Sequence, residues 1–203
     1  RDLRDKTYKH GPYYGFWVHD PKRRRIHKAT VRDRVLHHAI FRVINPVFEP
    51  TFIPTSFSCR VGKGTHKGVE SVRDMLRAES KNGAKQCWVL KCDIRKFFDS
   101  VDHSVLLGIL KRRVGDADAF GLLTKIVESY STTEDKGIPI GNLTSQMFAN
   151  IYMGEFDHFI KHSLRVKRYA RYTDDFVAVS TDKKYLEDLL PPMRDFLKEK
   201  LKL

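Results

Sequence analysis

Three aspartates stand where their carboxylates could carry chemistry. Asp174 and Asp175 are adjacent in an otherwise apolar, alternating stretch, and Asp93 ends the mostly apolar run 88–93. Adjacent like charges repel and an apolar sheet would desolvate both, so we expect a cation there. Carboxylate oxygens suit Mg²⁺, which completes its octahedron with waters and substrate phosphates. Two such ions can activate an attacking 3′-hydroxyl and stabilise a leaving pyrophosphate. Taken alone, the Asp-Asp pair is more typical of a solvated turn, so the metal hypothesis depends on Asp93 joining it.

Two elements must bring these carboxylates together. Residues 88–93 are typical of a buried strand that ends in a carboxylate. Residues 166–180 predict a hairpin whose turn contains Asp174 and Asp175. If the strand lies beside the hairpin, three oxygen donors converge on one spot. Residues 141–162 predict a long helix whose wide apolar stripe is core.

Short strands and further helices precede and follow these elements. Residues 16–19 and Ile26 predict two strands joined by a turn at Asp20-Pro21, and they flank the basic cluster 22–25. A helix should follow, with Asp33 near its start and Pro46 near its end. We further expect helices at 67–81 and 118–130, one capped by Ser100 or Asp102, and one from Lys183 that restarts at Pro191-Pro192.

Charge and composition limit the class of protein. The 203 residues carry 38 Lys and Arg against 25 Asp and Glu, a formal charge of +13, and 41% are apolar. This composition predicts a globular protein rather than a disordered basic tail. Residues 1–70 hold a balance of +9, against +4 for the remainder. A polyanion is the expected partner, because neutralised phosphates release counterions. A basic protein without such a partner is the alternative.

Cysteine usage and hydropathy predict the compartment. Three cysteines without C-x-x-C spacing favour a reducing environment. No apolar run approaches the length that spans a bilayer, so we expect a cytoplasmic protein without a membrane partner. The chain starts at Arg1 without an initiator Met, and residues 196–203 are still helical in pattern. We therefore expect a fragment.

Four motifs, in order and spacing, resemble those of reverse transcriptases, which are RNA-directed DNA polymerases. Residues 93–99 (DIRKFFD) and 172–175 (YTDD) are similar to the two catalytic motifs. Residues 137–146 (GIPIGNLTSQ) are similar to the motif between them, and residues 58–66 (SCRVGKGTH) to an upstream fingers motif. The resemblance implies an α/β (α+β) fold with the fingers and palm of a right-hand polymerase.

The resemblance also implies a domain division. Residues 1–90 would be mainly fingers, on the template and dNTP side, and residues 91–203 mainly palm with part of the fingers between the motifs. The rest of the palm and the helical thumb would lie beyond residue 203 and are absent from this chain. We therefore expect this stretch alone to bind nucleic acid poorly and to be weakly active or inactive.

Carried over position by position, the catalytic residues would be three aspartates. Asp93 and Asp174 would hold both metal ions, Asp175 would assist, and the backbone carbonyl of Ile94 would complete one coordination shell. The resemblance implies two Mg²⁺ ions, with Mn²⁺ as an alternative. The reaction would be two-metal-ion addition of dNTPs to the 3′-hydroxyl of a DNA or RNA primer on a template RNA.

Four residues would contact the incoming dNTP. Arg24 falls on the fingers position that contacts the triphosphate, and its bidentate guanidinium suits that task. Phe98 falls on the sugar gate, an aromatic ring that clashes with a ribonucleotide 2′-hydroxyl. The alternative for Phe98 is a core aromatic, which we expect its neighbour Phe97 to be. Ile140 and Gln146, in the motif between the aspartates, complete the set.

Three basic residues are the predicted nucleic-acid contacts. Arg60 and Lys63 belong to the upstream fingers motif, and Arg32 follows the basic cluster. Such side chains bind the phosphate backbone without reading sequence. For Arg32, a solvated position is equally compatible with the sequence.

Two positions depart from the family pattern. Most reverse transcriptases have Gln-Gly and Ser-Pro where this chain has Ile140-Gly141 and Ser145-Gln146. The form found here is similar to the bacterial or phage-encoded enzymes of diversity-generating retroelements, which copy a template RNA with errors at adenines, together with a small basic accessory protein. An apolar Ile140 removes a hydrogen-bonding contact near the nascent pair, so discrimination should weaken.

Other classes remain open at this stage. Within the polymerases, the alternatives are the enzymes of group II intron-like, retron and phage-defence systems. A non-catalytic RNA-binding scaffold is an alternative that the retained aspartates argue against. A two-metal nuclease would also use clustered aspartates, but it has no need for Phe98 or the fingers arginines.

Overall fold

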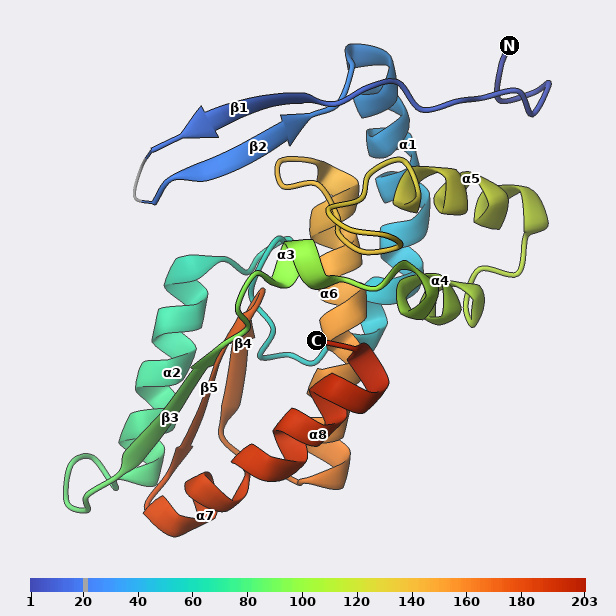
Figure 1. Ribbon diagram of the computed structural model, residues 1–203. Coiled ribbons are helices and arrows are strands. Elements are labelled where there is room, and N and C mark those ends of the chain that lie inside the picture. Colours follow the sequence, from blue (N-terminus) through green and yellow to red (C-terminus); the bar gives the residue numbers. More distant parts are fainter. Residues whose placement is uncertain (20–21) are drawn as a thin grey trace. The chain divides into compact units, whose positions relative to one another are not determined.

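The computed structural model describes residues 1–19 and 22–203 (Figure 1). The chain forms two compact units that interleave along the sequence. The first, the hairpin unit, comprises Arg1–Glu49 and Phe98–Phe148, and the second, the sheet unit, comprises Pro50–Phe97 and Ala149–Leu203. The turn predicted at Asp20-Pro21 lies outside the described residues. Among the helices that the structure describes, none is long and apolar enough to cross a membrane.

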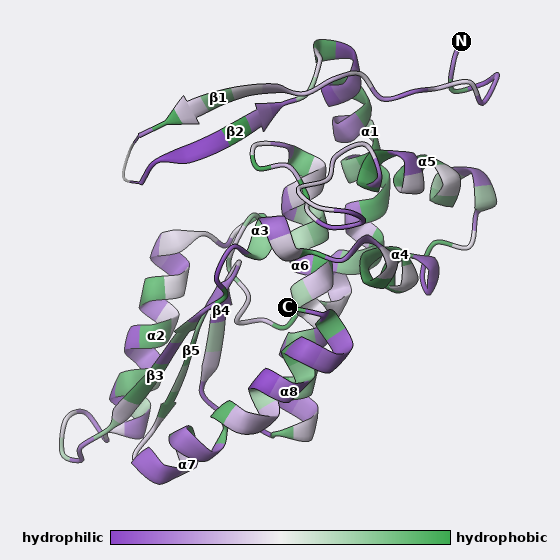
Figure 2. Ribbon diagram, in the orientation of Figure 1, coloured by the Kyte–Doolittle hydropathy of each residue, from purple (hydrophilic) through white to green (hydrophobic). Residues whose placement is uncertain are grey.

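A two-stranded antiparallel hairpin gives the hairpin unit its name. β1 (Tyr14–Val18) pairs with β2 (Arg24–Lys28) and places Trp17 opposite Arg25, which confirms the two predicted strands. All of β1 is exposed, and Figure 2 shows the hydrophilic character of β2. The Arg23 guanidinium lies 4.2 Å from the centroid of the Trp17 ring, a cation–π contact on the exposed indole. The hairpin therefore presents the basic cluster to solvent.

A long helix, α1 (Val31–Phe48), follows the hairpin. It begins after Thr30, whose hydroxyl accepts a hydrogen bond from the Asp33 amide at 3.3 Å. Pro46 lies inside the helix near its end, as predicted. The buried Ile40 and Phe48 lie on the same apolar face and outweigh the local cost of the proline.

Three shorter helices complete the hairpin unit. α3 (Phe97–Ser100) spans the boundary between the units, and α4 (His103–Lys111) and α5 (Ala117–Val127) follow. Asp102, rather than Ser100, caps α4, because its carboxylate accepts from the Val105 amide at 3.0 Å. The helix predicted at 118–130 is α5.

The sheet unit is built on three antiparallel strands. β3 (Trp88–Asp93), β4 (Tyr169–Tyr172) and β5 (Asp175–Ser180) pair in the order β3-β5-β4. β3 therefore lies beside the β4–β5 hairpin, which is the condition for the three aspartates to converge. α2 (Thr65–Glu79) covers one face through a cluster that includes Phe57, Met75, Ala170 and Val179. Both strands of the β4–β5 hairpin are largely buried, because β5 is central and the outer edge of β4 pairs with the segment around Thr55 and Phe57.

Helices α6, α7 and α8 complete this unit. α6 (Leu143–His158) starts in the hairpin unit, and its Phe156 ring contacts Phe176 of β5 at 5.1 Å between centroids. α7 (Lys183–Asp188) and α8 (Leu190–Leu201) follow β5, and α8 contributes Phe196 to the same contact. Figure 1 shows α2 and α8 on opposite sides of the sheet. As predicted, Pro191 and Pro192 lie in the first turn of α8.

Three expectations about these elements were wrong in detail. β3 is not a buried strand: it lies at the edge of the sheet, with Trp88 38% and Val89 47% exposed. The hairpin turn contains only residues 173–174, because Asp175 already pairs with Tyr172 as the first residue of β5. The long helix predicted to residue 162 ends at 158 and continues as a short π-helix, Phe159–Ser163.

Candidate active site

Strand pairing places two of the predicted catalytic aspartates opposite each other. Asp93 ends β3 and Asp175 begins β5, and the two are direct partners in the antiparallel register. Directly opposed residues point to the same face of a sheet, with Cβ atoms about 4.5 to 5.5 Å apart. Asp174 precedes Asp175 in the turn between β4 and β5. The sheet therefore brings all three carboxylates to one end of its strands.

A lysine already supplies positive charge beside these carboxylates. Lys91 Nζ lies 3.9 Å from Asp175 Oδ1, and alternation puts Lys91 on the same face as Asp93. The two side chains are 72% and 52% exposed, so the contact is screened by solvent and contributes little to stability.

The donor atoms fit a hard divalent cation. Within residues 1–19 and 22–203, no three Asp, Glu, His or Cys side chains form a ready-made metal cluster. Asp93, Asp174 and Asp175 offer only carboxylate oxygens, the donors that Mg²⁺ and Mn²⁺ prefer. Asp93 and Asp175 are exposed, so oxygens of a bound substrate can reach the same position. The site therefore fits an ion whose shell is completed by substrate.

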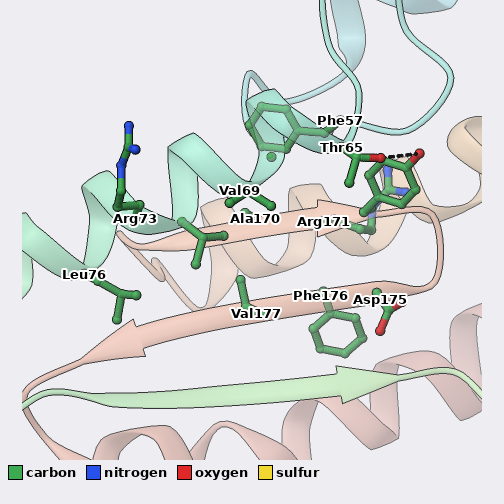
Figure 3. Close-up of a pocket in the computed structure, with 13 residues that line it drawn as sticks. Phe57, Thr65, Val69, Arg73, Leu76, Ala170, Arg171, Asp175, Phe176 and Val177 are labelled. Carbon is green, nitrogen blue, oxygen red and sulfur yellow. Dashed lines mark hydrogen bonds between the residues drawn. The ribbon is translucent and has the colours of Figure 1, made fainter.

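An apolar pocket adjoins the aspartates on the α2 face of the sheet (Figure 3). It has a volume of about 370 Å³ and lies between α2 and strands β4 and β5, with Asp175 at one end. The Thr65 hydroxyl and the Tyr172 hydroxyl are 3.3 Å apart across that end. Val69 and Val177 are among the apolar residues that line the pocket. The carboxylates thus border an apolar surface rather than a second polar cluster.

The loop that carries Arg60 and Lys63 is fastened by those same side chains. Arg60 Nη1 donates to the carbonyl oxygens of Ile53 and Ser56 at 2.8 and 2.9 Å. Lys63 Nζ donates to the carbonyl of Pro54 at 2.8 Å. Through these hydrogen bonds both side chains shape the loop that leads into α2. Gly64 precedes α2 with a φ of 106°, a conformation that favours glycine.

In the hairpin unit, β2 pairs with the segment that contains Ile140. The His27 amide donates to the Ile140 carbonyl at 2.9 Å, and Asn142 Nδ2 donates to the His27 carbonyl at 2.7 Å. Alternation along β2 puts Arg24 and Ile26 on one face. The strand that carries Arg24 therefore lies next to Ile140. Arg24 and Ile140 are both predicted to contact the dNTP, although they lie far apart in the sequence.

Ile26 was predicted as a strand residue, but its close approach to Gly141 was not predicted. A Cβ placed on Gly141 would lie only 2.5 Å from Ile26 Cγ2, and Gly141 has a φ of 106°. The absence of a side chain at Gly141 is what lets β2 approach this closely. The two-residue spacing from Arg24 was the available signal, because it puts both side chains on one face of a strand.

Three other predicted site residues lie in the same unit. The half-buried Phe98 accepts, through its carbonyl, a hydrogen bond from the Ile138 amide at 2.8 Å, whereas its neighbour Phe97 is 1% exposed, as expected for core. Gln146 is exposed on α6. Arg32 Nη2 donates to the Lys9 carbonyl at 2.6 Å and Arg32 Nη1 lies 3.6 Å from Asp2. The side chain of Arg32 therefore fastens the N-terminal segment.

Burial alters the titration of two groups near the predicted site. The pKa of His27 is lowered from 6.5 by burial and by the positive charge of Arg25, although Asp99 opposes the shift. The imidazole of His27 is therefore neutral at pH 7. The pKa of the Cys92 thiol, next to Asp93, is raised by burial, so this side chain stays a protonated packing residue.

One residue that sequence analysis missed is Arg171, one position before Tyr172. Its side chain is fully buried and forms an ion pair with Asp157 of α6 at 2.7 Å. Burial lowers the pKa of a guanidinium, but the Asp157 carboxylate more than offsets this effect and the pKa of Arg171 is raised. The available signal in the sequence was a charged residue, Arg171, within an apolar strand, together with Asp157 within the apolar stripe of a helix.

A sheet with three carboxylates at one end of its strands has the oxygen donors to hold divalent cations, and comparison with known proteins identifies the family. The family model described as reverse transcriptase (RNA-dependent DNA polymerase) matches residues 10–203. The chain therefore belongs to the reverse transcriptase family. The predicted fold class, α/β (α+β) with the fingers and palm of a right-hand polymerase, is confirmed.

Curated relatives and solved structures agree with this assignment. Protein YkfC of Escherichia coli (strain K12) is 25% identical over an alignment of 212 positions, gaps included. The alignment covers 86% of this chain and 55% of YkfC. Group II intron-encoded protein LtrA of Lactococcus lactis subsp. cremoris is 25% identical over 170 residues, covering 79% of this chain and 27% of LtrA. The matched part of the chain thus spans about half, or less, of the length of these relatives.

A solved structure supports the fold at lower sequence identity. Telomerase from Candida albicans, in complex with a TWJ fragment of telomeric RNA, superimposes with a TM-score of 0.63 and 13% identity. The match covers 98% of this chain and 42% of the telomerase chain. At this identity the likeness concerns the fold alone.

Proposed function

We propose that the protein is an RNA-directed DNA polymerase that adds dNTPs to a primer 3′-hydroxyl on a template RNA. The observation that carries the proposal is the register of Asp93 opposite Asp175, with Asp174 in the adjoining turn, in a chain of the reverse transcriptase family. Asp93, Asp174 and the Ile94 carbonyl would hold two Mg²⁺ or Mn²⁺ ions, with Asp175 assisting. Such ions, when bound, polarise the attacking hydroxyl and neutralise the leaving pyrophosphate.

The chain's own residues would bind and orient the substrates. Arg24 is exposed on β2, where its guanidinium can pair with the triphosphate in a bidentate manner. Phe98 would exclude ribonucleotides by contact with the 2′-hydroxyl. Ile140, whose backbone pairs with β2, and Gln146 would border the nascent base pair. Arg32, Arg60 and Lys63 would contribute positive charge along the template.

Partners and location follow from the same proposal. The partners would be template RNA, a DNA or RNA primer, and dNTPs, in the cytoplasm of a bacterium or a phage-infected cell. Residues 1–90 would serve mainly as fingers and residues 91–203 mainly as palm. A net charge of +13, with +9 in residues 1–70, supports a polyanionic partner on the fingers side.

Primer extension separates this proposal from its rivals. Purified full-length protein is incubated with Mg²⁺, dNTPs and an end-labelled primer on an RNA template. A polymerase lengthens the primer, a two-metal nuclease shortens it, and a scaffold shifts its mobility without changing its length. Only lengthening that depends on the template supports the proposal, and either of the other two results contradicts it.

For the subtype, we propose an error-prone enzyme of a diversity-generating retroelement, working with a small basic accessory protein. The supporting observation is Ile140 in place of the usual glutamine, beside Gly141. A group II intron-type role is the alternative, favoured by the relationship to the intron-encoded protein LtrA. The Ile140→Gln variant should reduce misincorporation opposite template adenine, measured by sequencing the cDNA. Unchanged misincorporation at adenine would favour the intron-type role.

A further inference from the structure

A buried arginine lies two residues before the aspartate turn, residues 173–174. The side chains of Arg171 and Asp157 are 0% and 1% exposed, and they come from β4 and α6. Charged side chains are almost never fully buried unless they are paired. Removing two charges from water is costly, and an apolar pair of similar volume is often at least as stable. The stability of the fold therefore does not by itself account for this ion pair.

Every N–H group of the guanidinium has a hydrogen-bond acceptor. Arg171 Nε donates to Asp157 Oδ1 at 2.8 Å, and Nη2 donates to Asp157 Oδ2 at 2.7 Å and to Ser56 Oγ at 3.1 Å. Nη1 donates to the Thr173 carbonyl at 2.8 Å and to Asn150 Oδ1 at 3.4 Å. A guanidinium has five such donors, so none is left over.

One of these bonds ends on the aspartate turn itself. The Thr173 carbonyl belongs to the peptide group that joins Thr173 to Asp174, so Arg171 fixes the plane of that peptide. Thr173 has a φ of 56°, a left-handed conformation that is unfavourable for a β-branched residue. The Thr173 hydroxyl also donates to Ser58 Oγ at 2.6 Å. Two side-chain contacts thus hold a strained turn in a single conformation.

The remaining partners hold the guanidinium in place. Tyr169 donates to Asp157 Oδ1 at 2.8 Å, and Asn150 Nδ2 donates to the Ser58 carbonyl at 2.8 Å, which orients the Asn150 amide oxygen toward Arg171. The main chain of Arg171 is also paired, because its amide donates to the Thr55 carbonyl and its carbonyl accepts from the Phe57 amide. The arginine therefore connects α6, the loop before α2 and the aspartate turn.

We propose that Arg171, held by Asp157, is a positioning residue that sets the orientation of Asp174 for catalysis. The inference rests on the proposed polymerase function and names a residue that acts through the carboxylate rather than on substrate. Second-layer groups around metal ligands typically change affinity or activity about 10- to 100-fold when they are replaced. Loss of the contact should therefore lower turnover while substrate binding, which uses other residues, is retained.

Arg171→Lys keeps the charge but cannot reproduce the fork of donors to Asp157 and Thr173. We expect kcat to fall about 10- to 100-fold with the KM for dNTP unchanged, and half-maximal activity to require more Mg²⁺. Hydrogen–deuterium exchange should rise in residues 172–176. The matched control is Arg168→Lys, since Arg168 also precedes the turn and pairs with Glu79 at 3.4 Å but is 42% exposed. The control should change none of these quantities.

The double variant Arg171→Met/Asp157→Leu separates positioning from stability. It replaces the ion pair with apolar side chains, so no buried charge is left without its counterion, and the melting temperature should fall less than in Asp157→Leu alone while the turn is still released. Wild-type kcat in either Arg171 variant below its melting temperature would overturn the proposal. If the wild-type protein does not extend a primer, the proposed polymerase function is wrong. In that case, faster hydrogen–deuterium exchange of residues 172–176 in Arg171→Lys, but not in Arg168→Lys, would still show that Arg171 positions the turn. Unchanged exchange in Arg171→Lys overturns the positioning role.

Discussion

Replacing Gly141 with alanine tests the packing that joins β2 to the segment around Ile140. Gly141 has a φ of 106°, and a methyl group there would lie 2.5 Å from Ile26 Cγ2. A non-glycine residue in such a conformation costs about 1 to 3 kcal/mol. Overpacking against a short, stiff side chain costs about another 1 to 3 kcal/mol. We expect Gly141→Ala to lower the free energy of unfolding of the hairpin unit by about 2 to 6 kcal/mol.

The two contributions can be separated by a double-mutant cycle. Ile26→Ala removes the methyl group that the new side chain would meet, so in that background only the backbone strain of Gly141→Ala remains. The cost of Gly141→Ala should therefore be about 1 to 3 kcal/mol smaller in the Ile26→Ala protein than in the wild type. Urea unfolding followed by the fluorescence of Trp17, with Trp88 replaced by phenylalanine, reports on the hairpin unit.

A second glycine in the same unit provides the control. Gly108 lies in α4, and a methyl group there would meet no atom within 4 Å. Gly108→Ala should leave stability unchanged or raise it by about 0.5 to 1 kcal/mol, since alanine is the better helix former. The reasoning is refuted if Gly141→Ala costs the same in both Ile26 backgrounds, within about 0.5 kcal/mol.

Two further predictions concern buried ionisable side chains. Burial and the neighbouring His10 lower the pKa of His37 from 6.5 to about 4. As the pH falls, His37 is therefore protonated in the unfolded state before it is protonated in the folded state. The contribution of His37 to the free energy of unfolding is complete above pH 6.5 and is lost toward pH 4, by at most about 3 kcal/mol. Urea midpoints at pH 7 and 4.5 should differ less in His37→Leu than in wild type, and an equal difference would contradict the assignment. Separately, Asp157→Leu leaves Arg171 buried and unpaired and should cost about 3 to 5 kcal/mol in urea unfolding; a loss below about 1 kcal/mol would mean that water reaches the pair.

Local sequence patterns predicted those elements whose structure depends on neighbouring residues. The alternation in residues 166–180 predicted the hairpin, and the apolar run before Asp93 predicted the strand beside it. The two prolines at 191–192 predicted where α8 begins, because proline suits only the first turn of a helix. These features predicted the strand and the turn that carry the aspartates, while the pairing of β3 with β5 is a distant contact that the local patterns left as a condition.

Features that depend on distant contacts were not predictable from local patterns. Both β3 and β4 lie at edges of the sheet, but the outer edge of β4 pairs with the segment around Thr55 and Phe57, whereas Trp88 and Val89 of β3 are exposed. No pattern within 88–93 encodes this difference. The continuation of α1 past Pro46 depends on the packing of Phe48. Arg171 and Asp157 each contradict the apolar pattern of their element, and only their contact explains them. The elements that carry the three aspartates were thus predicted, and the buried ion pair beneath the turn was not.

The most direct test of the central claim is Mg²⁺-dependent dNTP addition to a primed RNA template by the Asp174→Asn protein. Asparagine keeps the shape of the side chain but removes the charge that would hold a divalent ion. The control is Asp188→Asn, since Asp188 is an exposed residue that pairs with Lys184 at 3.3 Å on α7, which follows the end of β5 opposite to Asp175. The account predicts that extension is abolished in Asp174→Asn, with an unchanged circular dichroism spectrum, and is normal in the control. Extension at the wild-type rate by Asp174→Asn would contradict it.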